Sequence, residues 1–538
     1  MNQFFAALRL CGKLDFFSRK VAKTQNKNFK FFSVIDWHKI KEMKFLGIDI
    51  GTGGSRAVVI DERGKVLASE TTLHEEFASP EIGWAEQNPD DWWRACVAAI
   101  RSVLQVVKPE EIAAVSFSGQ MHGSVFLDEA DQIIRPALLW CDQRTDRQCA
   151  EITEKIGRQR LIELVSNPAV TGFTLPKILW LRENEPQSFE KTRAVLLPKD
   201  YIRLRLSGDK ASDVADSSGT LLFDVQNRKW SDEMISAFEL DANLFPKVYE
   251  STEVTGKVSA AGAGATGLIE GTPVVAGAGD NAAGAIGMGI VRARMLSATI
   301  GTSGVIFAVT DAPKLDLKGR IHTLCHAIPG RWHNTGVTLA AGLSFKWFRE
   351  NFGEGRSSYD ELTIEAENIP SGSDGLIWLP YLMGERTPHL DATARAAFVG
   401  LTASHTKAHL TRAVLEGVAF SLKDSIEIFS ELGARAESIR LGGGGAKSPL
   451  WQQIQADVYG QTVETIEAEE GAAFGAAILA GVGAGFWQTV DEACEKTIKS
   501  ARRIEPNPDA VKRLQKNYEA YKLLYSALRP ATAILTGR

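Results

Sequence analysis

Apolar residues near the start of the regular part of the chain fall into short runs separated by turns. Lys44–Ile50 is apolar apart from one acid, Asp49, and it leads into the turn Gly51-Thr52-Gly53-Gly54. Ser55–Ile60 and Val66–Thr72 are again strand-like. Runs of this length bounded by glycine predict a β-meander that opens on a hairpin.

Strand and helix patterns alternate along the rest of the chain. Ile112–Phe117 predicts a buried strand that ends at Ser118–Gly123, and Thr272–Ala276 predicts another that runs into a turn at Gly277-Ala278-Gly279. Asn88 and Pro89 have the residue types of an N-cap and a first helical position. The predicted helices include residues 89–107, 414–432 and 450–459. Such alternation predicts an α/β architecture with helices packed on the sheets.

One short pattern occurs twice. Ile50–Gly54 reads IGTGG and Ile300–Gly304 reads IGTSG, and each copy lies between two apolar runs. A unit repeated once in each half predicts two similar domains that face each other. No low-complexity linker separates them, so the repeat alone divides the chain into a first domain, 43–290, and a second, 291–538.

Charge and cysteine usage exclude several classes of protein. The 61 basic and 66 acidic residues nearly balance. The sequence has no long basic stripe, so it does not predict a nucleic-acid partner. No apolar stretch approaches the roughly 18 residues that span a membrane. The six cysteines are scattered without a CxxC pair, which favours reduced thiols in a cytosolic protein.

Residues 1–42 differ from the rest. They hold nine Lys and Arg against three acids and no sustained strand or helix pattern. A basic, acid-poor segment half fits a mitochondrial transit peptide, but this one is light in Ser and Ala. We expect a non-native or disordered extension, with Met43 as the natural initiator.

Four glycine-rich turns follow apolar runs, at residues 51–54, 277–279, 301–304 and 442–445. Glycine lets the backbone approach a ligand closely, and successive N–H groups in such turns bind phosphate oxygens. Each turn alone is more often a plain strand-to-helix connection, but four in one chain, two of them a matched pair with Thr, favour phosphate binding. The P-loop pattern is absent, because Ala446 precedes Lys447-Ser448. Gly262–Gly267 fits a dinucleotide fingerprint, but a poor strand precedes it, so a redox cofactor is a weak alternative.

Several polar side chains stand at predicted strand ends. Asp280 is either a helix N-cap or a functional carboxylate. Asp49 interrupts a buried strand, which is costly unless the carboxylate is exposed, paired or near a metal such as Mg²⁺. Met121 and His122 follow a strand, where α/β proteins bind ligands. Two His pairs with i, i+4 spacing, 322/326 and 405/409, lack the surroundings of a zinc site.

With these residues in view, the chain resembles the FGGY family of carbohydrate kinases from Met43 to about residue 530. Phe173–Asn184 looks like one long family signature and Gly443–Asp457 like the other. Shorter motifs at Trp84–Asp90, Ser118–Gly123 and Gly277–Ala283 resemble members that phosphorylate D-xylulose. The resemblance implies two actin-like, ribonuclease-H-like domains with a catalytic cleft between them.

The resemblance also implies site residues. Asp280 would be the general base that accepts the proton of the sugar hydroxyl, while Met121, His122 and Asn281 would contact the sugar. Asp49 would stand beside Mg²⁺, through water. The residues expected to bind ATP are Gly51, Thr52, Gly53, Gly301, Thr302, Gly443, Gly444 and Lys447. A homodimer is what relatives suggest. Another sugar (ribulose, gluconate, glycerol or a deoxyketose) and an actin-like ATPase without a sugar substrate remain alternatives.

Overall fold

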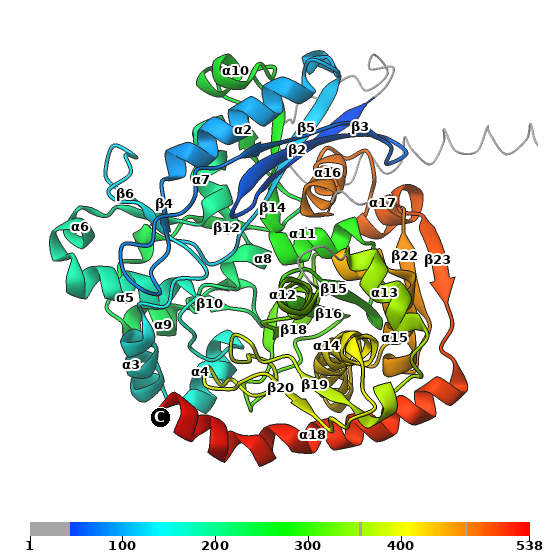
Figure 1. The fold of residues 1–538 in the computed structure, drawn as a ribbon. Helices are drawn as coiled ribbons and strands as arrows, with labels where there is room; N and C mark the ends of the chain where they lie inside the picture. Colours follow the sequence, from blue (N-terminus) through cyan, green and yellow to red (C-terminus); the bar gives the residue numbers. More distant parts are fainter. Residues whose placement is uncertain (1–42, 354–357, 468–470, 538) are drawn as a thin grey trace, which may run out of the picture. The chain divides into compact units, whose positions relative to one another are not determined.

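Each half of the chain forms a sheet around the same kind of hairpin (Figure 1). The computed structural model describes residues 43–353, 358–467 and 471–537. The expected extension, residues 1–42, lies outside the described residues.

The first sheet confirms the predicted meander. Strand β1 pairs with β2 in antiparallel register and with β5 in parallel register, and β14 continues the parallel side. In spatial order, the strands are β13 (Val254–Lys257), β14 (Pro273–Gly279), β5 (Ile112–Gly119), β1 (Lys44–Ile50), β2 (Gly54–Asp61) and β3 (Val66–Leu73).

The second sheet repeats this topology. Strand β15 pairs antiparallel with β16 and parallel with β21, and β22 continues the parallel side. The strands are β17 (His322–Cys325), β18 (Trp332–Thr338), β16 (Gly304–Thr310), β15 (Met295–Ile300), β21 (Ser438–Gly443), β22 (Val463–Ile466) and β23 (Ser500–Ile504). The repeated sequence is therefore the turn of two equivalent hairpins, β1–β2 and β15–β16. This is the mixed α/β fold predicted from the alternation of strand and helix patterns.

Helices pack on both sheets. Helix α2 (Pro89–Val103) and α7 (Pro198–Ser207) pack on the first sheet, and α14 (Lys407–Glu431) packs on the second. The predicted N-cap is confirmed, since the Asn88 side chain accepts from Asp90 N at 3.0 Å. Apolar side chains of each helix enter the core, Trp92 from α2 and Phe420 from α14 among them.

Two helices from different halves of the chain pack on each other. Helix α11 (Asp280–Gly287) follows β14, and α16 (Gly471–Gly483) follows β22 along the chain. Helix α16 nevertheless lies against β1, β5 and α11, as its orange ribbon beside the blue and green elements shows (Figure 1). A Cβ on Gly475 would come within 1.8 Å of the Ala283 carbonyl oxygen, so only glycine permits this approach of α16 to α11.

Three predicted details are wrong. Helix α2 ends at Val103 instead of Val107, because the next residues turn more tightly, with Val106 N donating to Val103 O. Helix α14 begins at Lys407, well before Val414, because Thr406 forms a capping box with His409. The predicted turn at 277–279 is the end of β14, where Gly277 has a φ of 75° at a shift in the register with β5.

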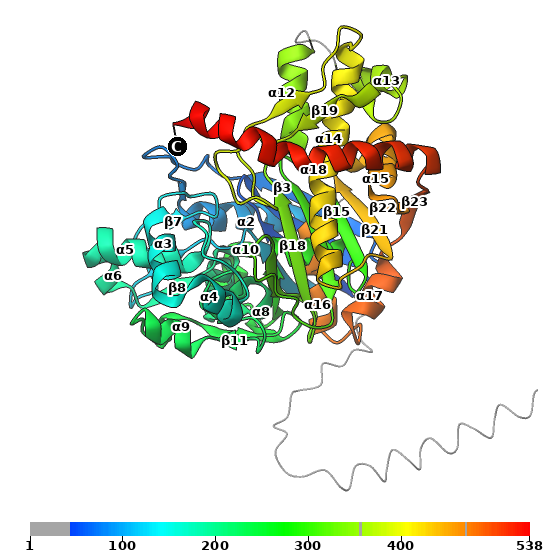
Figure 2. The same cartoon turned by 90° about the horizontal axis from the view of Figure 1, so that it is seen from below.

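The remaining elements connect or flank the two sheets. Tyr521 of α18 packs on Phe420 with ring centroids 5.5 Å apart, which fixes α18 near α15 and β19 (Figure 2). The other helices are α3 (Asp146–Ile156), α4 (Arg158–Val165), α5 (Thr174–Asn184), α6 (Pro186–Lys191), α8 (Val214–Ser217), α9 (Asp232–Ala237), α10 (Ala260–Thr266), α12 (Gly342–Phe352), α13 (Tyr359–Glu367), α15 (Pro449–Tyr459), α17 (Val490–Thr497) and α18 (Pro508–Thr536). The short strands are β4 (Glu86–Gln87), β6 (Val125–Leu127), β7 (Ala137–Leu138), β8 (Ala194–Leu196), β9 (Ala211–Asp213), β10 (Phe223–Asp224), β11 (Lys229–Trp230), β12 (Lys247–Tyr249), β19 (Ile377–Leu379) and β20 (Ala397–Val399).

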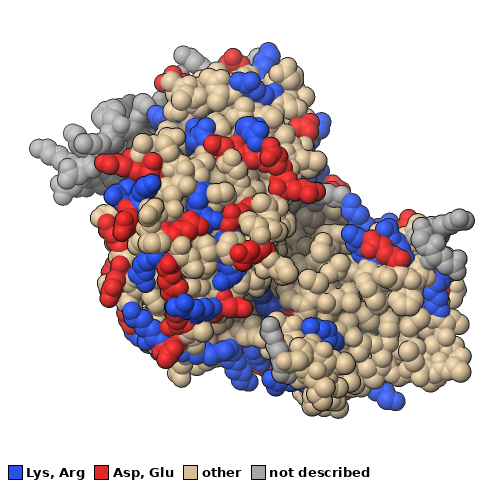
Figure 3. Space-filling model, turned by 60° about the vertical axis from the view of Figure 1, so that its left-hand side comes forward, with Lys and Arg blue, Asp and Glu red and all other residues tan. Residues whose placement is uncertain are grey.

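The surface agrees with the balanced charge of the sequence. Lys and Arg alternate with Asp and Glu over the left-hand part of the face shown in Figure 3. Within the described part of the chain, no helix has both the length and the apolar content to cross a membrane.

Candidate active site

Asp280 stands where β14 gives way to α11. The helix N-cap is Gly279, and Asp280 is the first helical residue, so the N-cap interpretation of Asp280 is wrong. Burial raises the pKa of Asp280 to about 7; the charge of Asp49 adds to this rise, and the backbone of Asn281 opposes it. A carboxylate with this pKa holds and releases a proton near neutral pH, which suits a general base.

Asp49 is the carboxylate that acts on Asp280. It lies in β1 opposite Ser118 of β5, and its Oδ1 is buried without a hydrogen-bond partner among the described residues. Burial raises the pKa of Asp49, while Ser118 and Arg56 lower it. An oxygen left in this state is a suitable ligand for a cation or for the water around one.

Met121 and His122 follow the end of β5, and Met121 lies beside Asn281. The Asn281 Nδ2 atom donates to Met121 Sδ at 3.6 Å, which joins the ends of β5 and β14. His122 Nδ1 donates to the Gly219 carbonyl at 2.8 Å, and its ring stacks on Phe173 with centroids 4.4 Å apart. Burial lowers the pKa of His122 to about 3. The imidazole is therefore neutral at physiological pH.

The backbone of His122 is held by a buried lysine. His122 has a φ of 67°, an unusual value for a side chain other than glycine. Lys177 Nζ donates to the carbonyl oxygens of His122 and Gly172, each at 2.8 Å, and Thr174 Oγ1 donates to His122 O at 3.2 Å. Burial lowers the pKa of Lys177 to about 7. The sequence pointed to Lys177 only as part of a family signature and gave no sign of this contact.

In each hairpin turn the first glycine donates a backbone hydrogen bond within the turn, but to acceptors at different positions. Gly51 N donates to Gly54 O at 3.0 Å, and Gly301 N donates to Ser303 O at 2.9 Å. Thr52 ties the first turn to the sugar-side residues, since its Oγ1 donates to Gln120 Oε1 at 3.1 Å. The predicted phosphate turn is thereby connected to the residue next to Met121.

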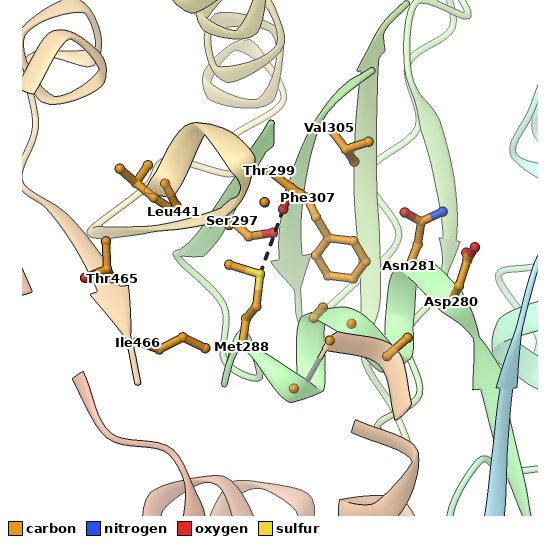
Figure 4. Close-up of a pocket in the computed structure, with 18 of the residues that line it drawn as sticks. Asp280, Asn281, Met288, Ser297, Thr299, Val305, Phe307, Leu441, Thr465 and Ile466 are labelled. Atoms are coloured by element: carbon orange, nitrogen blue, oxygen red, sulfur yellow. Dashed lines mark hydrogen bonds between the residues drawn. The ribbon is translucent and has the colours of Figure 1, made fainter. Parts of the chain in front are cut away.

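A cavity of about 560 Å³ separates α11 from the second sheet (Figure 4). Asp280 and Asn281 stand at one end, and the floor includes Thr299 and Phe307. Three of the predicted ATP-binding residues line it as well, namely Gly443, Gly444 and Lys447. The cavity thus brings the candidate base together with the predicted nucleotide residues of the second half.

A second cavity, of about 490 Å³, lies on the α12 and α13 side of the same glycine turns. Gly301, Thr302, Gly444 and Lys447 line it. The rest of its wall includes aromatic side chains that the sequence did not single out: Phe345, Tyr359 and Trp451. Flat rings beside phosphate-type turns suit a nucleoside.

The rejected alternatives find no support among the described residues. His322 begins the strand β17, and over residues 43–353, 358–467 and 471–537 no group of three or more His, Cys, Asp or Glu is arranged to hold a metal ion. Gly262 and Gly264 lie within the helix α10, which is not the strand-to-helix turn that a dinucleotide fingerprint requires.

Family models agree with this geometry. Residues 44–287 match the N-terminal domain of the FGGY family of carbohydrate kinases, and residues 296–484 match the C-terminal domain of that family. The chain belongs to the FGGY family of carbohydrate kinases.

Individual members of this family can be compared with the chain in sequence and in structure. The chain is 39% identical over 487 residues to a xylulose kinase of Bacillus subtilis, covering 90% of this chain and 97% of the relative. It is 40% identical over 490 residues to a xylulose kinase of Lactococcus lactis, covering 89% and 96%. The structure of xylulose kinase from Rhodospirillum rubrum superposes with a TM-score of 0.86 at 26% identity, covering 91% of this chain and 99% of that one.

Proposed function

We propose that this protein transfers the γ-phosphoryl group of ATP to D-xylulose, giving D-xylulose 5-phosphate. The observation that carries the proposal is the placement of Asp280 beside Asn281, which itself bonds to Met121. The relatives named xylulose kinase cover almost the whole chain, and this supports the choice of sugar.

Asp280 would act as the general base. The oxygen of a sugar hydroxyl forms a bond to the γ-phosphorus while the bond from that phosphorus to the β,γ-bridging oxygen breaks, and the hydroxyl proton goes to the Asp280 carboxylate. Such help is worth about 10²–10⁴-fold in rate. Met121, neutral His122 and Asn281 would bind and orient the sugar.

The phosphates of the nucleotide would lie between the two hairpin turns, and its nucleoside would lie within the second half of the chain. Backbone N–H groups at Gly51, Thr52 and Gly53, and at Gly301 and Thr302, would bind the phosphate oxygens. The nucleoside would occupy the second cavity, with Gly443, Gly444 and Lys447 at the border between the two cavities.

Mg²⁺ is part of the proposal through Asp49. The unpartnered Oδ1 of Asp49 would hold the ion through a water molecule. When bound, the ion supplies positive charge that offsets the charge of the phosphates.

The proposal also covers the roles of the two halves of the chain, the cellular location and the oligomeric state. Residues 43–290 would bind the sugar and supply the base, and residues 291–538 would bind ATP. A cytoplasmic location, expected from the scattered cysteines, and a homodimer also belong to the proposal.

The test is ADP release from purified protein with Mg·ATP. D-xylulose, D-ribulose, L-ribulose, glycerol and gluconate are compared, with Asp280→Asn as the control. A strong preference for D-xylulose that disappears in the variant is expected. Preference for another sugar would retain the family chemistry and refute D-xylulose, and steady ATP hydrolysis that no sugar stimulates would refute the kinase activity.

A further inference from the structure

A third cavity, of about 220 Å³, lies in the second half of the chain, between α14, α18 and the segment that follows β19. It shares no lining residue with the two cavities of the candidate active site. Helix α14 contributes three acids to its wall, Asp424, Glu427 and Glu431, whose spacing of three and four residues places them on one face of the helix. The cavity is therefore a separate place where a ligand could bind.

Aromatic rings form the wall opposite these acids. Tyr521 and Tyr525 come from α18, while Tyr381 and His389 come from the segment after β19. The hydroxyl oxygens of Tyr381 and Tyr521 lie 3.0 Å apart, and the His389 ring stacks on Tyr525 with centroids 3.5 Å apart. Burial lowers the pKa of His389 to about 4, so this ring adds no positive charge at physiological pH.

Backbone hydrogen bonds hold the part of the wall that carries His389. Glu385 N donates to Asp391 O at 2.9 Å, and Asp391 N donates to Glu385 O at 2.8 Å, which closes residues 385–391 into a loop. Thr387 N donates to Val337 O of β18 at 3.0 Å. The loop is thus fixed to the second sheet, and the cavity is formed before a ligand arrives.

The charges that line the cavity do not balance. Its two cations each lie near a glutamate, since Arg320 Nη2 is 2.9 Å from Glu431 Oε2 and Lys522 Nζ is 3.8 Å from Glu427 Oε2. Over residues 43–353, 358–467 and 471–537, no Lys, Arg or His nitrogen lies within 4.0 Å of the Asp424 carboxylate. Asp424 is the acid of this wall that lacks a cation.

Asp424 is also nearly buried, with 9% of its surface exposed. Tyr518 Oη donates to Asp424 Oδ1 at 2.6 Å, and in the described part of the chain the other carboxylate oxygen accepts no hydrogen bond. Burial raises the pKa of Asp424 to about 7, and the Tyr518 hydrogen bond opposes this rise. A buried carboxylate without a cation is costly, so a positively charged ligand would stabilise it.

We propose that this cavity binds a small organic ammonium ion, with the charged nitrogen at Asp424 and the carbon chain against the tyrosine rings. A carboxylate beside aromatic rings suits such an ion, because the nitrogen gains a charged hydrogen bond while the rings attract the cation and cover its apolar part. The proposal does not depend on which sugar the enzyme phosphorylates.

The experiment is calorimetric titration of the purified protein at pH 8 with n-butylammonium chloride. 1-Butanol, which has the same carbon chain without the charge, and potassium chloride are titrated in parallel. Butylammonium is expected to bind at least about 10-fold more tightly than 1-butanol, and Asp424→Asn should remove about 10-fold or more of its affinity. Tyr525→Leu, which removes one ring, should cost about 3-fold.

Asp509→Asn is the matched control, because Asp509 is an exposed acid in the first turn of α18 and lies outside the cavity lining. Asp280→Asn should also bind butylammonium as the wild type does, since its carboxylate belongs to the other site. Thermal unfolding of each variant checks folding, and Tyr525→Leu carries the test if Asp424→Asn does not fold. Absence of binding, equal affinities for butylammonium and 1-butanol, unchanged affinity in Asp424→Asn, or equally tight binding of potassium would overturn the proposal.

Discussion

Asp49 and Thr299 occupy equivalent positions in the two sheets. Each is the next-to-last residue of the central strand, β1 or β15, and each precedes an Ile-Gly-Thr sequence. Their surroundings differ, because Asp49 Oδ1 is unpartnered among the described residues whereas Thr299 Oγ1 donates to Met288 Sδ at 3.8 Å. The two hairpins have the same antiparallel pairing but different chemistry, because only the first has a carboxylate at this position.

The first prediction compares variants of Asp49 and Thr299. Asp49→Asn should lower kcat by about 100-fold or more, because the amide holds Mg²⁺ and its water poorly. Thr299→Ala, at the equivalent position, should cost far less. Steady-state kinetics over a range of Mg²⁺ concentrations checks both; equal losses in the two variants would contradict a special role for Asp49.

The second prediction is the pH dependence of the reaction. Asp280 must be deprotonated to accept a proton, and its pKa is raised to about 7 by burial and by Asp49. The value of kcat/KM for the sugar should therefore fall as the pH drops below about 7, with a slope of one. A flat profile between pH 5 and 8 would show that no group with this pKa controls the reaction.

The third prediction concerns stability. The folded-state pKa of Asp280, about 7, lies above its ordinary value of 3.8, so the folded protein binds more protons than the unfolded chain in this window. The contribution of Asp280 to stability is therefore lost as the pH rises from about 4 to 7. Asp280→Asn should stabilise the ligand-free protein at pH 8 by about 1 kcal/mol. Urea unfolding should show a smaller gain at pH 5, and a gain of the same size at both pH values would assign it to another cause.

The fourth prediction tests the lysine beneath His122. Lys177→Met removes the donor from two carbonyl groups and should raise the KM for the sugar about 10-fold while lowering stability by about 1–3 kcal/mol. The KM for ATP should hardly change. Lys191→Met, on the exposed side of α6, is the control. If sugar binding were unaffected while stability fell, the Lys177 contact would matter for folding alone.

The fifth prediction concerns the second cavity. Tyr359→Ala should raise the KM for ATP about 5-fold, because the ring lines the space proposed for the nucleoside. Phe352→Ala removes an exposed ring at the end of the neighbouring helix α12, outside the cavity lining, and should not alter this KM. Binding of ATP measured by calorimetry checks both variants, and equal affinities would place the nucleoside elsewhere.

Local pattern was enough for the parts of the fold that neighbouring residues determine. The hairpin at Gly51 and its copy at Gly301 followed from apolar runs and glycine, and Asp280 stood out at a strand end. The contact between Lys177 and His122 joins residues far apart in sequence, so no local pattern could reveal it.

The position of helix α16 has a consequence for folding during biosynthesis. It packs on β1 and β5, which both lie within the first 119 residues, yet it is among the later helices to be made. Chains emerge N-terminus first, so the face of β1 around Gly47 stays uncovered until residues 471–483 have been translated. Packing on the first sheet is complete only after most of the polypeptide has been made. A nascent chain stalled before α16 would present an apolar surface to chaperones and proteases.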